Sequence, residues 1–471
     1  MNASAQPARQ STDSTSTRSH GTNRAFVVVA AITITFLAAS AAPTPLYSRY
    51  QIELSLSPVT VTVIFAAYAA ALLISLLITG RLSDFVGRRP VTIAAIGVQA
   101  IAMIVFVFAD SAGDLICARV LQGLATGTAM AVTGAALSDL RPERAPVIAS
   151  VSPVVGMALG ALGSGILVAY APGPEVLVYI VFLALFVILG WAASALLPET
   201  APRRHGALHS LRPQVSVPPA ARTPLLVAAP ILISVWSLGG FYLSLGPSLA
   251  REISGIESPV IGGLLVSALT FSGAGSILAL RSQPPVNVFK IGALTLMVGL
   301  ATTLVGILAY SLLPLFLGTV IAGVGFGAGF QGAMRTIMPT ARPGERAGLL
   351  STFYIVSYLS MGLPAIAAGL LTTRWGIEST ALALGSVVIA LSGIALCTVT
   401  VTHRRSADTT ESLPTAHDVR RHANRTGLNV PTEREQAIAA TARYIFSVTD
   451  SLRSVELSET PPAHAFSIER P

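Results

Sequence analysis

Charged residues are scarce in this chain: Asp, Glu, Lys and Arg make up 11% of its 471 residues, and Lys290 is the only lysine. A soluble domain carries roughly 25% charged residues, so a water-soluble globular protein is excluded. Cysteine is equally scarce. Cys117 and Cys397 both lie in apolar segments, which excludes a disulfide framework and a cysteine-based metal site.

Several chemical devices are missing as well. No Gly-x-x-x-x-Gly-Lys loop is present, so neither nucleotide binding nor ATP-driven pumping is expected. The seven histidines fall in the termini, the central linker and the tail, hence no zinc site or other cofactor is predicted. No nucleophile and base converge, which argues against an enzyme. The formal charge of +8 is spread over loops and termini, so it does not indicate a nucleic-acid partner.

Apolar residues, in contrast, make up 52% of the chain and form long uncharged runs. No charged residue lies between Glu53 and Arg81 or between Arg89 and Asp110. A helix of about 20 apolar residues crosses a bilayer core. The runs therefore predict an all-α integral membrane protein with twelve spans, near 25–45, 57–79, 90–109, 113–137, 145–170, 174–197, 225–247, 259–280, 288–309, 313–337, 346–372 and 379–402.

Polar segments precede, divide and follow these spans. Residues 1–24 are rich in Ser and Thr and too polar to fold, 198–224 are rich in Pro and Arg, and the polar tail 403–471 is expected to be largely disordered. A short amphipathic helix is the alternative for Glu433–Phe446. The first apolar run leads into many more spans, so it is interpreted as a retained span and not as a signal peptide. The predicted domains are 1–24, 25–197, 198–224, 225–402 and 403–471.

Arginine is distributed unequally between the segments on the two sides of the membrane. Segments that alternation places outside hold only Arg49, Arg251 and Arg374, whereas the loops, linker and termini placed inside hold nearly all the others. Short cytoplasmic loops carry an excess of Lys and Arg. Both termini and the linker are therefore predicted to be cytoplasmic, in a multi-pass protein of the cell (plasma or inner) membrane whose surrounding partner is the lipid bilayer.

The most specific motif is the charged turn Gly80–Val91 between the second and third spans. It resembles the loop signature of the major facilitator superfamily, Gly-x-Leu-Ala-Asp-Arg-x-Gly-Arg-Arg, and departs from it at Ser83 and Phe85. The alternative is an ordinary basic loop that obeys only the positive-inside rule. The resemblance implies the major facilitator fold, two six-helix bundles related by pseudo-twofold symmetry. The matching residues are Gly80, Leu82, Asp84, Gly87, Arg88 and Arg89.

The two halves of the chain also repeat each other. Val120–Gly127 resembles Val320–Gly327, and the loop Arg141–Ala145 resembles Arg342–Ala347. Parallel repeats of this kind form a substrate site at their interface and rock around it. Chance recurrence of small residues is an alternative for the glycine-rich pair, but it does not explain the two loops.

Arg119 is the one charge predicted to lie well inside a span. A charge at that depth is costly and usually faces a cavity or a partner, so it marks a functional site. With Gln122 it resembles the superfamily's fourth-span signature, Arg-x-x-Gln-Gly, which implies a role in substrate contact or proton coupling. The alternative is an arginine that snorkels outward.

Two further groups are candidates. The run Gly156–Gly165 resembles the fifth-span signature of drug and proton antiporters, although Gly156, Gly160 and Gly165 are also spaced for close helix packing alone. Several aromatic and polar side chains are candidates to line a central cavity. By resemblance, the spans that face it favour Trp236, Tyr242, Phe330 and Gln331.

The turn is also predicted to act as a conformational latch formed by Gly80, Asp84, Gly87, Arg88, Arg89 and Asp139. Asp84 and Arg88 are four residues apart and share a helix face if the second span continues into the turn. Asp139, at the same end of the fourth span, is expected to accept a hydrogen bond from Arg88. The resemblance implies that Asp84 also meets the start of the eleventh span, near Arg346–Leu350, when the cytoplasmic side is shut. The alternative is that these charges only fix topology.

These features favour a secondary active transporter that moves small amphipathic molecules by alternating access, with efflux preferred. The absence of acidic residues at mid-depth argues against a cation site and leaves open whether protons are the coupling ion. The alternatives are an uptake permease or facilitator for a neutral or anionic metabolite, and a membrane sensor that does not transport. The partner in every case is a small molecule.

Overall fold

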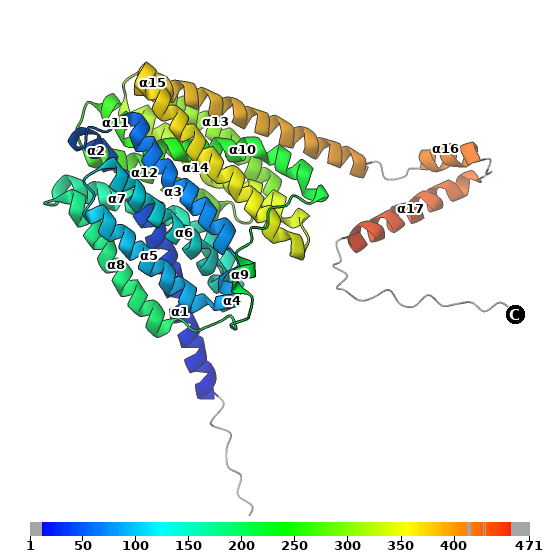
Figure 1. The fold of residues 1–471 in the computed structure, drawn as a ribbon. Helices are drawn as coiled ribbons and strands as arrows, with labels where there is room; N and C mark the ends of the chain where they lie inside the picture. The colour runs from blue at the N-terminus through cyan, green and yellow to red at the C-terminus, as the bar shows by residue number, and fades with distance from the viewer. Residues whose placement is uncertain (1–11, 412–415, 427, 429, 454–471) are drawn as a thin grey trace, which may run out of the picture. The chain divides into compact units, whose positions relative to one another are not determined.

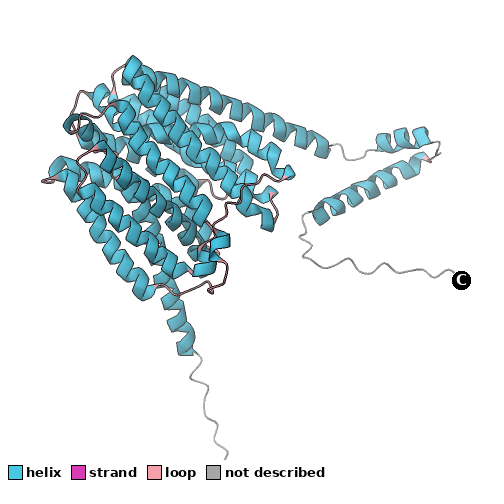
Figure 2. Ribbon diagram, viewed as in Figure 1, coloured by secondary structure: helices cyan, strands magenta, loops and turns pink. Residues whose placement is uncertain are grey.

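The computed structural model describes residues 12–411, 416–426, 428 and 430–453, and all its regular structure in these residues is helical (Figure 2). The chain divides into two compact units, Met1–Val399 and Thr400–Pro471. The first half of the larger unit contains α1 (Thr12–Ala41), α2 (Tyr47–Glu53), α3 (Pro58–Thr79), α4 (Ser83–Val86), α5 (Arg88–Val107), α6 (Ala112–Leu140), α7 (Ala145–Tyr170) and α8 (Pro174–Leu196).

The second half follows the short helix α9 (Ala207–Ser210). It contains α10 (Pro219–Ser244), α11 (Gly246–Ser254), α12 (Pro259–Ala279), α13 (Pro285–Leu308), α14 (Leu312–Ile337), the 3₁₀ turns η1 (Met338–Thr340) and η2 (Pro343–Glu345), and α15 (Arg346–Glu411). Apart from α4 and the two 3₁₀ turns, the order of its helices repeats that of the first half. The short helices α2 and α11 follow the first and seventh spans, as expected for two six-helix bundles related by pseudo-twofold symmetry.

Eleven helices in the described part of the chain are long and apolar enough to cross a membrane, one fewer than the twelve predicted spans. The difference lies in α15, whose apolar part covers residues 346–403 and includes both of the last two predicted spans. Gly376 breaks this element with φ 79° and ψ 164°, a conformation that glycine adopts without strain. The chain turns back at the top of Figure 1, within α15. The eleventh and twelfth spans are therefore the two arms of α15.

Local sequence sets where the helices begin. Proline occupies the first turn of many of them, where its missing N–H is no loss. Ser57 caps α3 by accepting a hydrogen bond from the Thr60 N–H at 3.1 Å, and Ser111 with Asp114 forms a capping box at the start of α6. Since a bilayer core offers no water to unpaired backbone groups, the apolar runs between these signals form complete helices.

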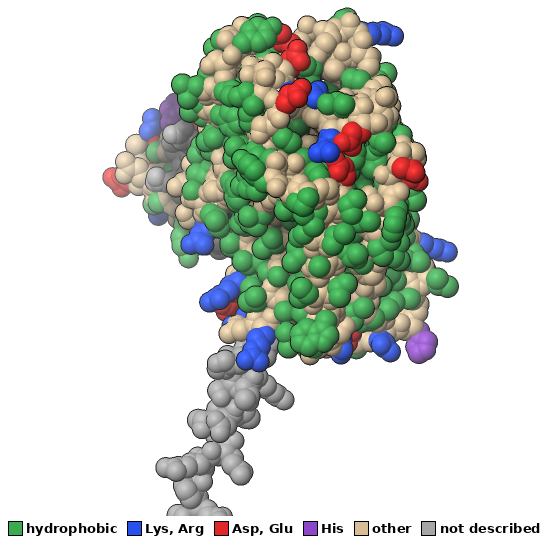
Figure 3. Space-filling view, turned by 90° about the vertical axis from the view of Figure 1, so that its left-hand side faces the viewer, with side chains coloured by type: hydrophobic (Ala, Val, Ile, Leu, Met, Phe, Trp, Pro, Cys, Tyr) green, Lys and Arg blue, Asp and Glu red, His purple; other side chains and the backbone are tan. Residues whose placement is uncertain are grey.

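Hydrophobic side chains cover most of the face of the bundle that Figure 3 shows, and its charged side chains gather toward the two ends. We name the end that carries the Gly80–Val91 turn, Arg141 and Arg335 the basic end, and the end that carries α2 and α11 the distal end. At the distal end no ion pair between described residues joins the two halves. Thr44 Oγ1 donates to the Leu243 carbonyl at 3.0 Å, and Ser48 Oγ lies 3.3 Å from Ser248 Oγ.

Both ends of the chain differ from the predicted disorder. α1 begins at Thr12, so part of the segment 1–24 is helical, because lengthening a helix that has already formed avoids the cost of nucleation. Residues 1–11 lie outside the described residues. In the second unit, α16 (Ala416–Thr426) and α17 (Thr432–Arg453) form helices, and α17 contains the segment Glu433–Phe446. Residues 412–415, 427, 429 and 454–471 of the tail lie outside the described residues.

The two tail helices are joined by an ion pair. Arg420 donates from Nε and Nη2 to the Glu435 carboxylate at 2.8 and 2.7 Å, and this bond holds the pKa of Glu435 below its usual value. Ala423 and Ala439 are buried. The pairing gives α16 and α17 tertiary contacts that the polar composition of the tail did not predict.

Candidate functional site

A cavity of about 540 Å³ lies between the two halves, within the size range of small-molecule sites. It extends from Ser40 and Leu243, next to the distal contacts, to Pro146, Arg281 and Arg335 at the basic end. The distal contacts, from Thr44 to Leu243 and from Ser48 to Ser248, lie just beyond its inner end. The cavity is therefore shut toward the distal end and reaches the basic end.

Aromatic rings form most of one wall of the cavity. The Trp236 ring is central: its centroid lies 5.6 Å from that of Phe330, 5.5 Å from Tyr358 and 6.1 Å from Phe326. Tyr354 extends the cluster, with its ring 6.2 Å from Tyr358. Such arrangements offer flat apolar faces to a ligand and are held by edge-to-face packing. The sequence-predicted residues Trp236, Phe330 and Gln331 all line the cavity.

Three polar atoms in this wall are buried and have no hydrogen-bond partner among the described residues: Trp236 Nε1, Gln331 Oε1 and Arg335 Nη1. Gln331 Nε2 donates to the Ile277 carbonyl at 3.3 Å, and Arg335 Nη2 donates to the Gln283 carbonyl at 3.0 Å. Buried polar groups are normally paired. The free donor and acceptor atoms are thus available to a ligand.

Tyr242 does not line the cavity, which corrects the prediction from sequence. Tyr242 is 3% exposed, and its hydroxyl lies 2.9 Å from Thr319 Oγ1 on α14. Thr319 occupies the position that corresponds to Arg119 in the first half. The tyrosine therefore faces α14 inside the second bundle, because its hydroxyl finds a partner there.

Arg119 also lies outside the cavity wall and is fully buried. Its Nη1 donates to the Ser40 carbonyl at 2.8 Å and to Gln122 Oε1 at 2.6 Å, and its Nε donates to the Tyr47 hydroxyl at 3.0 Å. Its guanidinium carbon lies 5.2 Å from the centre of the Tyr68 ring, within cation–π distance. Full burial rules out the snorkelling alternative.

These contacts cap the end of α1, where the last helical carbonyls lack partners within the helix. Gln122 Nε2 donates to the Ala39 carbonyl at 2.9 Å, next to the bond from Arg119 to Ser40. Ser164 Oγ donates to the Ala42 carbonyl at 2.5 Å. A cation at a helix C-terminus is also favoured by the helix dipole. Arg119 and Gln122 therefore hold the end of α1 against α6 in the interior of the first bundle.

The predicted glycines are packing residues in this structure. Gly156 and Gly160 let α7 touch the backbone of α1, since a Cβ at Gly160 would collide with the Ala38 carbonyl. Gly165 lies against Gly263 and Pro259 in the second half, where a Cβ would lie 3.1 Å from the Pro259 carbonyl oxygen. Small residues permit such close approaches. The glycine run thus joins α7 both to α1 and to α12.

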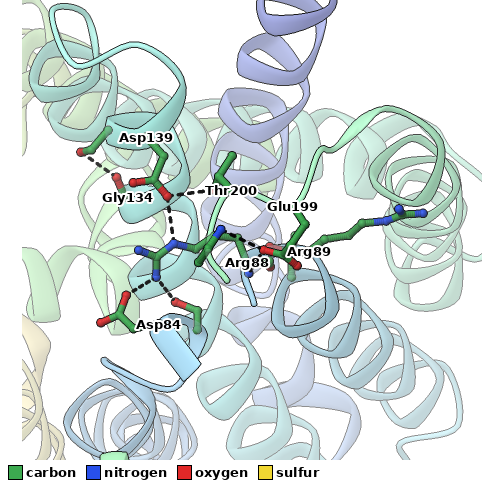
Figure 4. A network of polar contacts seen from close by, with 11 residues as sticks. Asp84, Arg88, Arg89, Gly134, Asp139, Glu199 and Thr200 are labelled. Atoms are coloured by element: carbon green, nitrogen blue, oxygen red, sulfur yellow. Dashed lines mark hydrogen bonds and ion pairs between the residues drawn. The ribbon is translucent and has the colours of Figure 1, made fainter. Parts of the chain in front are cut away.

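Figure 4 shows the predicted latch, centred on Arg88. Arg88 Nη1 donates to Asp84 Oδ1 at 2.5 Å and to Ser83 Oγ at 2.6 Å, and its Nε donates to Asp139 Oδ2 at 3.1 Å. Arg89 points away and donates to the Ser194 carbonyl. The contacts of Arg88 with Asp84 and Asp139 thus join α4, α5 and α6.

Two residues after the sixth span complete this network and were missed in the sequence. The Glu199 carboxylate accepts from the backbone N–H groups of Arg88 and Arg89 at 2.7 and 3.3 Å, and Thr200 Oγ1 donates to Asp139 Oδ2 at 2.8 Å. Gly87, with φ 107°, brings the backbone so close that a Cβ would meet the Glu199 carboxylate. The sequence did contain a signal for Glu199: it is a carboxylate that directly follows a span, on the same side of the membrane as the basic turn.

The latch lies within the first half and the linker. Gly80 lines a separate small pocket with Ala347 and Leu350, but no hydrogen bond joins Asp84 to the start of α15 among the described residues. The carbonyl of Gly348 instead accepts from the Ser216 N–H of the linker at 3.3 Å. The contact between Asp84 and α15, expected when the basic end is shut, stays a prediction.

A helical membrane protein with two repeated bundles and a cavity open to one end belongs to the class of alternating-access transporters. The sequence profile of the Major Facilitator Superfamily matches residues 25–294, more than half of the chain, and the chain belongs to this family. Among the described residues no three of His, Cys, Asp and Glu lie where they could hold a metal ion.

Curated relatives are distant. The multidrug resistance protein MdtL of Klebsiella pneumoniae (strain 342) is 24% identical over 324 residues, which cover 64% of this chain and 78% of that protein. An uncharacterised MFS-type transporter of Mycobacterium tuberculosis is 32% identical over 124 residues, or 26% of this chain and 20% of that protein.

Solved structures share the fold at low identity. A point mutant of the nucleoside transporter NupG matches with a TM-score of 0.64 and 12% identity, covering 79% of this chain and 99% of that one. A bacterial homolog of the human lysosomal transporter Spinster, in an inward-facing and unoccupied conformation, matches with a TM-score of 0.65 and 15% identity, covering 81% and 97%. The human organic anion transporter MFSD10 matches with a TM-score of 0.58 and 16% identity, covering 79% and 99%.

Proposed function

We propose that this transporter exports small amphipathic molecules from the cytoplasm across the plasma membrane by alternating access. The observation that carries the proposal is the cavity of about 540 Å³, which is walled by aromatic rings and reaches the basic end. Short basic loops are retained in the cytoplasm, so the basic end is the cytoplasmic end, and both termini lie there. The cavity then receives its substrate from the cytoplasm.

The lining supports a broad apolar substrate class. Trp236, Tyr354 and Tyr358 offer flat faces, while few polar groups fix a ligand's orientation. The name of the Klebsiella relative, a multidrug resistance protein, agrees with export. Proton coupling is outside the proposal, because no Asp, Glu or His lines the cavity in the described part of the chain.

A cellular accumulation assay tests the proposal. Cells that lack their own multidrug exporters are loaded with fluorescent amphipathic compounds, with and without the protein. We expect lower accumulation with the wild type than with Trp236→Ala, which removes the centre of the aromatic wall but leaves Arg119 and the latch intact. Equal accumulation of every compound in cells with the wild-type protein and in cells without it would overturn the proposal.

Uptake of a neutral or anionic metabolite is the second candidate. Arg281 and Arg335 both line the cavity, and two of the solved structures of the same fold are a nucleoside transporter and an organic anion transporter by name. The same assay separates the candidates by sign, because an uptake permease raises the accumulation that an exporter lowers.

A further inference from the structure

We propose that the cavity selects amphipathic organic anions, whose acidic group binds Arg335 at the basic end while an aromatic body packs on Trp236. The inference rests on the proposed function, because it assigns a substrate class to the same cavity. Two of the residues that line this cavity, Arg281 and Arg335, are cationic, and none is acidic. Neither arginine is ion-paired within the described part of the chain.

Arg335 is positioned to bind an anion. The bond from its Nη2 to the Gln283 carbonyl, 3.0 Å long, fixes the guanidinium plane and leaves the buried Nη1 without a partner. The dipole of α14 favours a cation in its last turn, which explains a charge there. It does not explain a buried charged donor with no acceptor, which is costly unless a ligand fills the place.

Arg281 has a different environment. It follows the end of α12, is exposed, and lines the same cavity. An exposed charge at the mouth of a cavity raises the local concentration of ligands of opposite sign. We therefore assign binding of the ligand's acidic group to Arg335 and long-range attraction of the anion to Arg281. Added salt is expected to weaken the contribution of Arg281 to anion binding more than that of Arg335.

The apolar part of the ligand site lies one to two turns before Arg335, toward the N-terminus of α14. Gln331 is four residues before Arg335 and shares its helix face. Phe330, whose ring packs on Trp236, is five residues before Arg335, which corresponds to roughly 7.5 Å along the helix axis. A molecule whose acidic group and ring system are about this far apart spans both. An acceptor on its ring system can receive a hydrogen bond from the unpaired Trp236 N–H. A donor on its ring system can give a hydrogen bond to the unpaired side-chain carbonyl of Gln331.

Three fluorescent probes that share one ring system separate charge from shape: N-dansylglycine is an anion, dansylamide is neutral and dansylcadaverine is a cation. Binding to the purified full-length protein is measured by dansyl fluorescence. We expect the anion to bind at least tenfold more tightly than the cation. A cation that binds as tightly as or more tightly than the anion overturns the inference.

Substitutions then locate the acidic group. Arg335→Gln is expected to weaken N-dansylglycine about tenfold or more, since hydrogen bonds between ionised partners are the strong ones, and to change dansylamide less than twofold. Retained dansylamide binding shows that the variant is folded. Arg222→Gln removes an exposed charge on α10 outside the cavity lining and is expected to leave all three affinities unchanged. An equal loss for all probes in Arg335→Gln, or a loss of anion binding in Arg222→Gln, contradicts the assignment.

Transport of the probes distinguishes this inference from the proposed function. Selective binding of N-dansylglycine without export of any probe leaves the anion site in place and defeats the export proposal. The opposite result is export of dansylamide and dansylcadaverine that is unchanged in Arg335→Gln, together with no preference for N-dansylglycine. That result defeats the anion site and leaves the export proposal in place.

Discussion

Arg119 is a buried charge that caps the C-terminal end of α1. Replacement by Ala leaves the Ser40 carbonyl, the Gln122 amide oxygen and the Tyr47 hydroxyl without their donor in the bilayer interior. Each buried unsatisfied group costs about 1–3 kcal/mol. We expect Arg119→Ala to reach the membrane, to lose transport and to unfold at a lower temperature.

Arg119→Lys provides the matched comparison. One ammonium group keeps the charge but lacks the planar fork that reaches Ser40 and Tyr47 together, so partial recovery is expected. Thermal unfolding in detergent, followed by size-exclusion chromatography, measures both variants. Wild-type stability and transport in Arg119→Ala would contradict the capping role.

At this scale the sequence identified Arg119 and Gln122 but not their partners. A charge within an apolar run is visible in the sequence. The carbonyls of Ala39 and Ser40 became acceptors only because α1 ends at Ala41 against α6, which is a tertiary fact. Arg281 and Arg335 were missed for a related reason: each lies at or near the end of a span in the sequence, and only the folded halves bring them to one cavity.

At the element scale, the close pairing of α1 with α7 depends on Gly156 and Gly160, and a Cβ at Gly160 would meet the backbone of α1 at the shorter distance. In Gly160→Ala the new methyl group meets the Ala38 backbone, so the helices must separate. Overpacking of this kind costs about 1–3 kcal/mol. We expect a lower unfolding temperature and a lower yield of folded protein.

Gly163→Ala is the control, because nothing lies within 4 Å of a Cβ at that position. It changes the same helix by the same methyl group. If both variants were equally stable, the close contact between α1 and α7 would not be required.

The latch gives a prediction about conformational balance. Asp84 contacts Arg88 in this structure and is expected to contact the start of α15 when the basic end is shut. A helix N-terminus stabilises a carboxylate by about 0.3–1 kcal/mol at exposed sites. Asp84→Asn should therefore shift the resting population toward the state described here and slow transport without removing substrate binding.

Distances between a spin label at the basic end of α3 and one at the start of α15 measure that shift. We expect a larger share of long distances in Asp84→Asn than in the wild type. An unchanged distribution together with normal transport would mean that the turn only fixes topology.

Positions of the elements followed from hydrophobic runs, as the described helices α3, α5, α7 and α8 show. The runs were predictive because a bilayer imposes both length and complete backbone pairing. The bond from Arg88 to Asp139 was also expected, because Asp139 ends the fourth span on the same side as the turn. Glu199 was not, because its approach to α5 depends on how the chain leaves α8.

For the whole molecule, charge asymmetry predicts the orientation. With Cys117 and Cys397 replaced by Ser, a single cysteine at His205 in the linker should react with a membrane-impermeant maleimide only after the cells are permeabilised. His205 is exposed, so the label has access once it crosses the membrane. Labelling in intact cells would place the linker outside and reverse the topology.

The central claim, export through the cavity between the halves, is tested most directly in energised everted membrane vesicles, whose outer surface is the cytoplasmic face. The compound used is one whose cellular accumulation the protein lowers. We predict uptake into vesicles that carry the wild type, several-fold above that of vesicles that carry Trp236→Ala at the same protein level. Uptake equal in the two, or loss of preloaded compound from wild-type vesicles, would contradict export.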